Sequence, residues 1–164
     1  MSVLARCHLR KSTVHLRDVM SVAQTILDAL GESQAELSLE IVGNHRIQRL
    51  NRTYRHHDHP TDVLSFPIRE VPGPHTMLLG DVVISLPMAL KQAKHADHSP
   101  DEELVTLLIH GILHLLGYDH EHHERDARCM RRKETALLRQ LRPLPRLIRM
   151  NGLKNTDRPL RAIS

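Results

Sequence analysis

The segment between Ser99 and Gly117 restricts the fold more than any other part of the chain, because it is apolar on nearly every side. Ser99 and Pro100 are typical of the N-cap and the first residue of a helix, and Glu102 is placed as the return partner of a capping box. Gly117 is typical of a helix end. A helix that is apolar all round is a buried one. The sequence therefore predicts a central helix that other elements surround.

The other periodic segments predict a small sheet with helices around it. Alternating and continuous apolar runs predict strands over residues 3–9, 37–41, 63–68 and 78–86. Helical spacing predicts helices over residues 16–30, 44–54 and 124–141, with Asn44 as a candidate N-cap. We therefore expect a single α+β domain over residues 1–142. Residues 143–164 are rich in Arg and Lys and are expected to form a basic, flexible C-terminal tail.

Composition excludes several classes of function. The chain has one Phe, two Tyr and no Trp, too few aromatic residues for a surface that stacks nucleic-acid bases. The net charge of +4 suits an anionic partner. The longest apolar run is too short to span a bilayer, and the N-terminus carries Arg and His where a signal peptide is apolar. We therefore expect a cytoplasmic protein without a membrane partner.

Histidine is unusually frequent, with 14 residues, and three of them have the spacing of metal ligands. His110 and His114 lie four residues apart, so a helix brings both imidazoles to one face. Gly117 can turn the chain back, so that His120 reaches the same ion. Three imidazoles leave one tetrahedral position open, as in catalytic zinc sites. The alternative is two hydrogen-bonded core histidines and one surface histidine, but a single Zn²⁺ ion would satisfy both buried imidazoles at once. His122 is a second candidate for the third ligand.

The same spacing occurs in the metzincin protease motif HExxHxxGxxH, with one difference. Gly111 stands where those proteases have the glutamate that acts as general base. Glycine cannot accept a proton, so the sequence disfavours zinc proteolysis. A metal site without this base suits an anionic substrate, for which Zn²⁺ acts mainly as a Lewis acid.

Four segments resemble the YbeY family of bacterial metal-dependent endoribonucleases. The segment HGILHLLGYDH, from His110 to His120, is similar to the family signature HGxLHLxGYDH. The segments LNRTYR, TDVLSFP and LGDVVIS, which begin at Leu50, Thr61 and Leu79, are similar to further family blocks in the same order. The resemblance covers roughly residues 36–141. It implies a small mixed β-sheet with flanking helices around the central helix.

The resemblance also implies a function and a site. It implies one Zn²⁺ ion held by His110, His114 and His120, and Arg55 as a catalytic residue; a guanidinium can hold a phosphodiester through paired hydrogen bonds. The expected activity is zinc-dependent, single-strand-specific cleavage in 16S rRNA 3′-end maturation and ribosome quality control. The expected partners are the 16S rRNA precursor, the small ribosomal subunit and its assembly factors. The alternatives are a non-catalytic, zinc-containing ribosome assembly factor and a metzincin-like zinc peptidase.

Overall fold

The computed structural model describes residues 3–9, 14–68, 77–119 and 123–149. The elements follow in the order β1 (Val3–Cys7), α1 (Leu16–Ala29), β2 (Glu36–Val42), α2 (Asn44–Arg55), β3 (Val63–Pro67), β4 (Leu78–Ser85), α3 (Leu86–Ala96), α4 (Pro100–Leu115) and α5 (Glu124–Leu141). The expected α+β class is confirmed, and each of these elements except α3 is predicted from the sequence.

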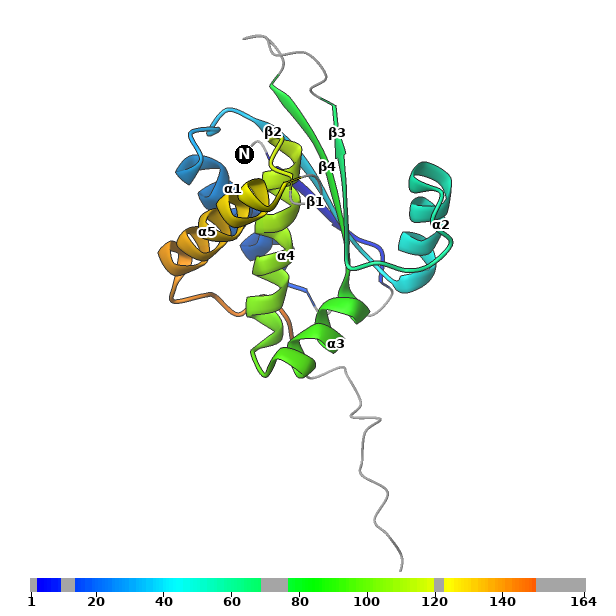
Figure 1. Cartoon of the computed structure of the whole chain (residues 1–164). Coiled ribbons are helices and arrows are strands. Elements are labelled where there is room, and N and C mark those ends of the chain that lie inside the picture. Colours follow the sequence, from blue (N-terminus) through cyan, green and yellow to red (C-terminus); the bar gives the residue numbers. More distant parts are fainter. Residues whose placement is uncertain (1–2, 10–13, 69–76, 120–122, 150–164) are drawn as a thin grey trace, which may run out of the picture.

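The four strands form one mixed sheet in the order β1-β2-β4-β3 (Figure 1). β1 pairs with β2 and β2 with β4 in parallel, whereas β3 runs antiparallel to β4 along the edge. Val82 of β4 lies between Leu39 of β2 and Ser65 of β3. The mixed sheet implied by the family resemblance is therefore present, and β3 leaves one side of its backbone unpaired within the sheet.

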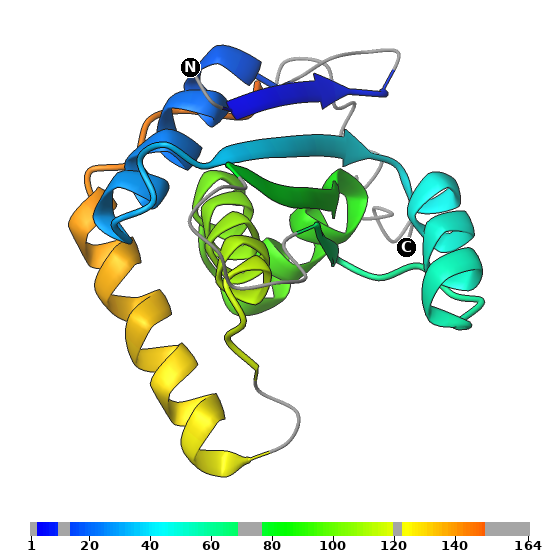
Figure 2. The same cartoon turned by 90° about the horizontal axis from the view of Figure 1, so that it is seen from above.

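Helices cover the two faces of the sheet unequally. α1, α4 and α5 lie on one face and α2 lies on the other (Figures 1 and 2). The larger core is formed between the sheet and the first group of helices, and it includes Ile26, Leu39, Ile84, Leu108 and Ile112. A smaller apolar cluster under α2 contains Val42, Ile47, Leu64 and Val83. The expected central position of α4 is confirmed, because α4 packs against β3, β4, α1, α3 and α5.

The start of α4 is as predicted in one respect and different in another. Ser99 is the N-cap, and its hydroxyl accepts a hydrogen bond from the Glu102 amide at 3.1 Å. The Glu102 carboxylate instead accepts a hydrogen bond from Arg142, with 3.0 Å between Nη2 and Oε1. The return bond of a capping box is therefore replaced by an ion pair to the residue that follows α5.

Two local expectations are corrected. α3 begins at Leu86, directly after β4, with Ser85 as an N-cap whose hydroxyl accepts from the Met88 amide. The apolar run from 78 to 86 is therefore a strand that passes into a helix without a loop. Asn44 is not an N-cap, because Gly43 holds that position in α2. The Asn44 side chain instead accepts a hydrogen bond from the Ser85 hydroxyl at 2.7 Å.

The chain after α5 returns to the core as far as it is described. Leu147 and Ile148 are buried, and Ile148 forms a β-bridge with Val14. The Asp101 carboxylate accepts hydrogen bonds from the amides of Leu147 and Ile148 at 2.8 and 2.9 Å. Core packing thus continues to Ile148, and residues 150–164 of the expected tail lie outside the described residues. Within the described part of the chain, no helix has both the length and the apolar character needed to cross a bilayer.

Candidate metal centre

Two of the three expected ligands meet on one face of α4, near the end of the helix. His110 Nε2 and His114 Nε2 lie 3.0 Å apart, and the rings are 4.5 Å apart at their centroids with their planes inclined at 70°. Two nitrogens bound at 2.0–2.1 Å to one tetrahedral zinc ion lie about 3.3 Å apart. The two nitrogens therefore converge nearly as one shared ion requires. Both side chains are only partly buried, so this face can be reached from solvent.

A carboxylate of α5 lies behind the first histidine. Glu134 Oε1 is 2.6 Å from His110 Nδ1, and the two side chains are 22% and 28% exposed. A carboxylate that accepts the Nδ1 proton fixes the tautomer and the orientation of the ring. His110 Nε2 then keeps a lone pair directed toward His114. The donor set fits a metal such as zinc, because neutral imidazoles with a supporting carboxylate are typical zinc ligands.

Sequence reasoning missed Glu134, although one signal was available. Met130 and Leu137 are the buried residues of α5, and Glu134 lies four positions after the first and three before the second. A charged residue on the inward face of an amphipathic helix needs a partner. The periodicity does not identify that partner, because His110 lies 24 residues away on α4.

The third expected ligand, His120, lies outside the described residues, and so does the other candidate, His122. The turn that should bring the chain back is described as far as Asp119. Gly117 has φ +92°, the left-handed region that glycine adopts readily, and its amide donates to the His114 carbonyl at 3.0 Å. Among the residues that the structure describes, no group of three or more potential metal ligands comes together. The pair His110–His114 is therefore the described part of the expected site.

Gly111 lies on the face of α4 that packs against the sheet. A Cβ atom there would come within 2.7 Å of Val82 Cγ1 and 3.3 Å of Val63 Cγ2. The Gly111 carbonyl also accepts a hydrogen bond from the Ser65 hydroxyl at 3.0 Å. The position that holds the general base in metzincins thus faces a tightly packed strand, with no room for a glutamate side chain.

Arg55 is the last residue of α2, and β3 holds it in place. Its Nη2 donates a hydrogen bond to the Ser65 carbonyl at 2.6 Å, and its guanidinium carbon lies 5.7 Å from the centre of the Phe66 ring. The Arg55 side chain remains exposed. Since the Ser65 hydroxyl bonds to Gly111, one serine connects Arg55 to the turn of α4 that lies between the two histidines.

Comparison with known proteins agrees with the motifs and the fold. Residues 6–142 match the family model described as "Endoribonuclease YbeY". The chain belongs to the YbeY endoribonuclease family. A YbeY endoribonuclease of Sulfurihydrogenibium is 49% identical over 109 residues, which cover 66% of this chain and 72% of the relative. The YbeY endoribonuclease of Aquifex aeolicus is 44% identical over 133 residues, covering 81% and 88%.

The fold of this YbeY chain is also found in a solved structure. The solution structure of a Thermotoga maritima protein matches it with a TM-score of 0.59. That match covers 85% of this chain and 88% of the other, at 24% sequence identity. At this identity the likeness concerns the fold alone.

Proposed function

We propose that this chain is a metal-dependent endoribonuclease that cuts single-stranded RNA. The observation that carries the proposal is the convergence of His110 Nε2 and His114 Nε2 at 3.0 Å, in a chain whose relatives are named endoribonucleases. Its substrate in the cell is the 3′ end of the 16S rRNA precursor. It acts in the cytoplasm with the small ribosomal subunit and its assembly factors, where it also serves ribosome quality control.

His110 and His114 would hold one zinc ion, with His120 as the third ligand that the family resemblance implies. The bound ion supplies a Lewis acid that withdraws charge from a phosphate oxygen. Neutral imidazoles leave the double positive charge of the ion uncompensated, which favours an anionic phosphodiester over a neutral peptide bond. Glu134 keeps the proton of His110 on Nδ1, so that Nε2 remains a ligand.

Arg55 would bind the scissile phosphate. Among the described residues only the Ser65 carbonyl accepts a hydrogen bond from this guanidinium, so its other N–H groups can donate to phosphate oxygens. The bond to Ser65 and the contact with Phe66 reduce the rotamer freedom that the side chain would otherwise lose on binding. The attacking group is either water or the 2′-OH of the RNA. Water leaves a simple phosphate end and the 2′-OH leaves a 2′,3′-cyclic phosphate, so end-group analysis of the products distinguishes the two.

The test compares cleavage of a single-stranded RNA spanning the 16S 3′ end by wild type, Arg55→Ala and Arg52→Ala, all purified identically. Arg52 is a matched control, because it is an exposed arginine of the same helix whose contact is with Asp58 at 3.8 Å. The proposal requires that wild type and Arg52→Ala cut and that Arg55→Ala does not. Equal cleavage by all three would mean that a contaminant cuts or that Arg55 takes no part.

Two other functions predict different results, which measurements of RNA binding and of casein cleavage would show. A non-catalytic assembly factor would bind the RNA in all three forms and cut it in none. A zinc peptidase would cleave casein and lose this activity with a chelator. The packing of Gly111 against Val82 argues against the peptidase, because the position beside His110 cannot hold a general base.

A further inference from the structure

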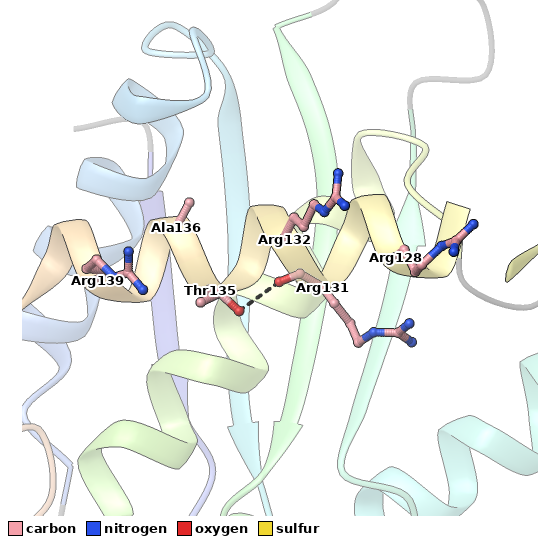
Figure 3. Close-up of a pocket in the computed structure, with 6 residues that line it drawn as sticks. All are labelled: Arg128, Arg131, Arg132, Thr135, Ala136 and Arg139. Atoms are coloured by element: carbon pink, nitrogen blue, oxygen red, sulfur yellow. Dashed lines mark hydrogen bonds between the residues drawn. The ribbon is translucent and has the colours of Figure 1, made fainter. Parts of the chain in front are cut away.

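The outward side of α5 carries four arginines around a shallow hollow of about 390 Å³ (Figure 3). We call this surface the arginine face; it is lined by Arg128, Arg131, Arg132, Thr135, Ala136 and Arg139. Positions 128, 131, 132, 135 and 139 follow helical spacing, so they share one side of α5. The side chains are exposed, whereas Met130 and Leu137 face the core. The arginine face is therefore a surface that the described part of the chain leaves exposed.

The positive charge on this face is not compensated within the described part of the molecule. None of its four guanidinium groups has a hydrogen-bond or ion-pair partner among the described residues. By contrast, Arg142, three positions after Arg139, pairs with Glu102. Glu134 lies on the same helix but contacts His110. Like charges three and four residues apart, such as Arg128 with Arg131 and Arg132, destabilise a helix. An anionic ligand would remove this repulsion.

The surroundings favour a polynucleotide backbone as that ligand. Positions 128 to 139 span about 16 Å along the helix, which is long enough for several successive phosphates. Guanidinium groups match phosphate oxygens through paired hydrogen bonds. No aromatic residue belongs to the arginine face, so contacts with phosphates rather than stacking with bases would dominate. The strongly exposed large apolar residues of the described chain all lie elsewhere, which argues against insertion into a lipid surface.

The helix that carries the arginine face also contacts the candidate metal centre. Glu134, which contacts His110, lies on α5 between Arg132 and Arg139. We infer that the arginine face binds the sugar–phosphate backbone of single-stranded RNA outside the point of cleavage and so guides the strand to the histidines of α4. The guiding role rests on the proposed function, whereas the binding role can be tested without it.

The first experiment measures binding of a fluorescent single-stranded RNA of about 20 nucleotides by anisotropy over a series of salt concentrations. Each phosphate contact on a single strand contributes about 0.7 to the slope of log K against log salt. In the α5 variant, Arg128, Arg131, Arg132 and Arg139 are all changed to Gln. This variant should reduce the magnitude of the slope by about 3. All proteins carry Arg55→Ala in this experiment so that the RNA stays intact. Circular dichroism and thermal melting show whether each variant is folded.

A control variant that loses the same number of positive charges shows whether RNA binding depends on the arginine face or only on the net charge of the protein. It changes Arg6, Arg17, Lys91 and Arg146 to Gln, all of which are exposed and belong to other elements or loops. We expect its salt slope to stay close to that of the parent protein. Equal effects of both quadruple variants, or an unchanged slope in the α5 variant, would overturn the inference. So would loss of binding to phosphatidylserine vesicles by the α5 variant with unchanged RNA binding, which would indicate a membrane surface.

The second experiment measures cleavage of a long RNA and of a short RNA of about four nucleotides, with Arg55 intact. The α5 variant should raise KM at least tenfold for the long RNA and leave both KM and kcat for the short RNA nearly unchanged. Equal losses on both substrates would contradict a guiding role. If the loss of the four arginines reduces the salt slope as expected but the wild type cuts neither RNA, the proposed cleavage fails while the arginine face remains supported.

Discussion

Gly111 of α4 lies so close to Val82 of β4 that a Cβ atom on the glycine would come within 2.7 Å of Val82 Cγ1. This contact brings the helix that carries His110 and His114 directly against the sheet. It also explains why a glycine stands next to the first histidine. A glycine is needed at this position for the close packing of α4 on β4, and there is no space here for a carboxylate side chain.

Substitution of this glycine should therefore destabilise the fold. Alanine improves helix propensity by about 1 kcal/mol, but the clash with Val82 costs more. We expect Gly111→Ala to lower the free energy of unfolding by about 1–3 kcal/mol in a denaturant titration. In a Val82→Ala background the loss should shrink, giving a coupling energy of about 1 kcal/mol or more. A Gly111→Ala protein as stable as wild type would contradict this account of the packing.

Removal of one histidine should abolish the stabilisation that zinc provides. At a zinc concentration 100 times the dissociation constant, binding stabilises the folded state by about 2.7 kcal/mol. We expect a zinc-dependent rise in the melting temperature of wild type and none in His110→Ala or His114→Ala. His95→Ala is the control, since His95 is an exposed histidine of α3. A full zinc response in both ligand variants would rule out this pair as ligands.

Glu134 should affect metal affinity without being a ligand. Loss of a carboxylate that orients a ligating histidine typically weakens metal binding by about 10–100-fold. We expect Glu134→Gln to raise the zinc dissociation constant by about this factor, with one ion still bound, as measured by competition with a chelator. Glu124→Gln changes an exposed carboxylate of the same helix and should have no effect. If the two variants bind zinc with equal affinity, Glu134 does not support the metal site.

We expect that a lysine at position 55 cannot take over the role of Arg55 in RNA cleavage. A lysine keeps the charge but lacks the planar fork that binds Ser65 and phosphate together. We expect Arg55→Lys to lower kcat by about 10²-fold or more, a loss typical of removing a group that stabilises transition-state charge. Its unfolding free energy should stay within about 0.5 kcal/mol of wild type, because the side chain is exposed. Near-normal cleavage by Arg55→Lys would show that charge alone suffices.

Local signals predicted most of the fold. The cap at Ser99, the apolar run of α4 and the glycine at 117 are all signals within about 20 residues of sequence, and they are confirmed. α3 was missed because it starts at Leu86 without a turn residue between strand and helix. Ser85 ends β4 and also caps α3, so the apolar strand pattern runs directly into the helix.

The candidate site was only partly accessible to sequence reasoning. The i, i+4 spacing is enough to predict that His110 and His114 meet, because a helix dictates it. The supporting contacts of Glu134 and Ser65 depend on how helices pack on each other and on the sheet. These contacts join residues 24 and 46 positions apart, and no periodic pattern encodes which partners they find. His120 remains a prediction from spacing and family resemblance.

The carboxylate of Asp101 fastens Leu147 and Ile148 to the first turn of α4. His110 and His114 lie nine and thirteen residues further along that helix, which corresponds to about 14–20 Å. An affinity tag joined directly after Arg149 would therefore start near the first turn of α4, at the opposite end of the helix from the histidines. A tag at this position should therefore leave zinc binding by His110 and His114 undisturbed, which makes it a suitable point for immobilising the protein in the metal measurements.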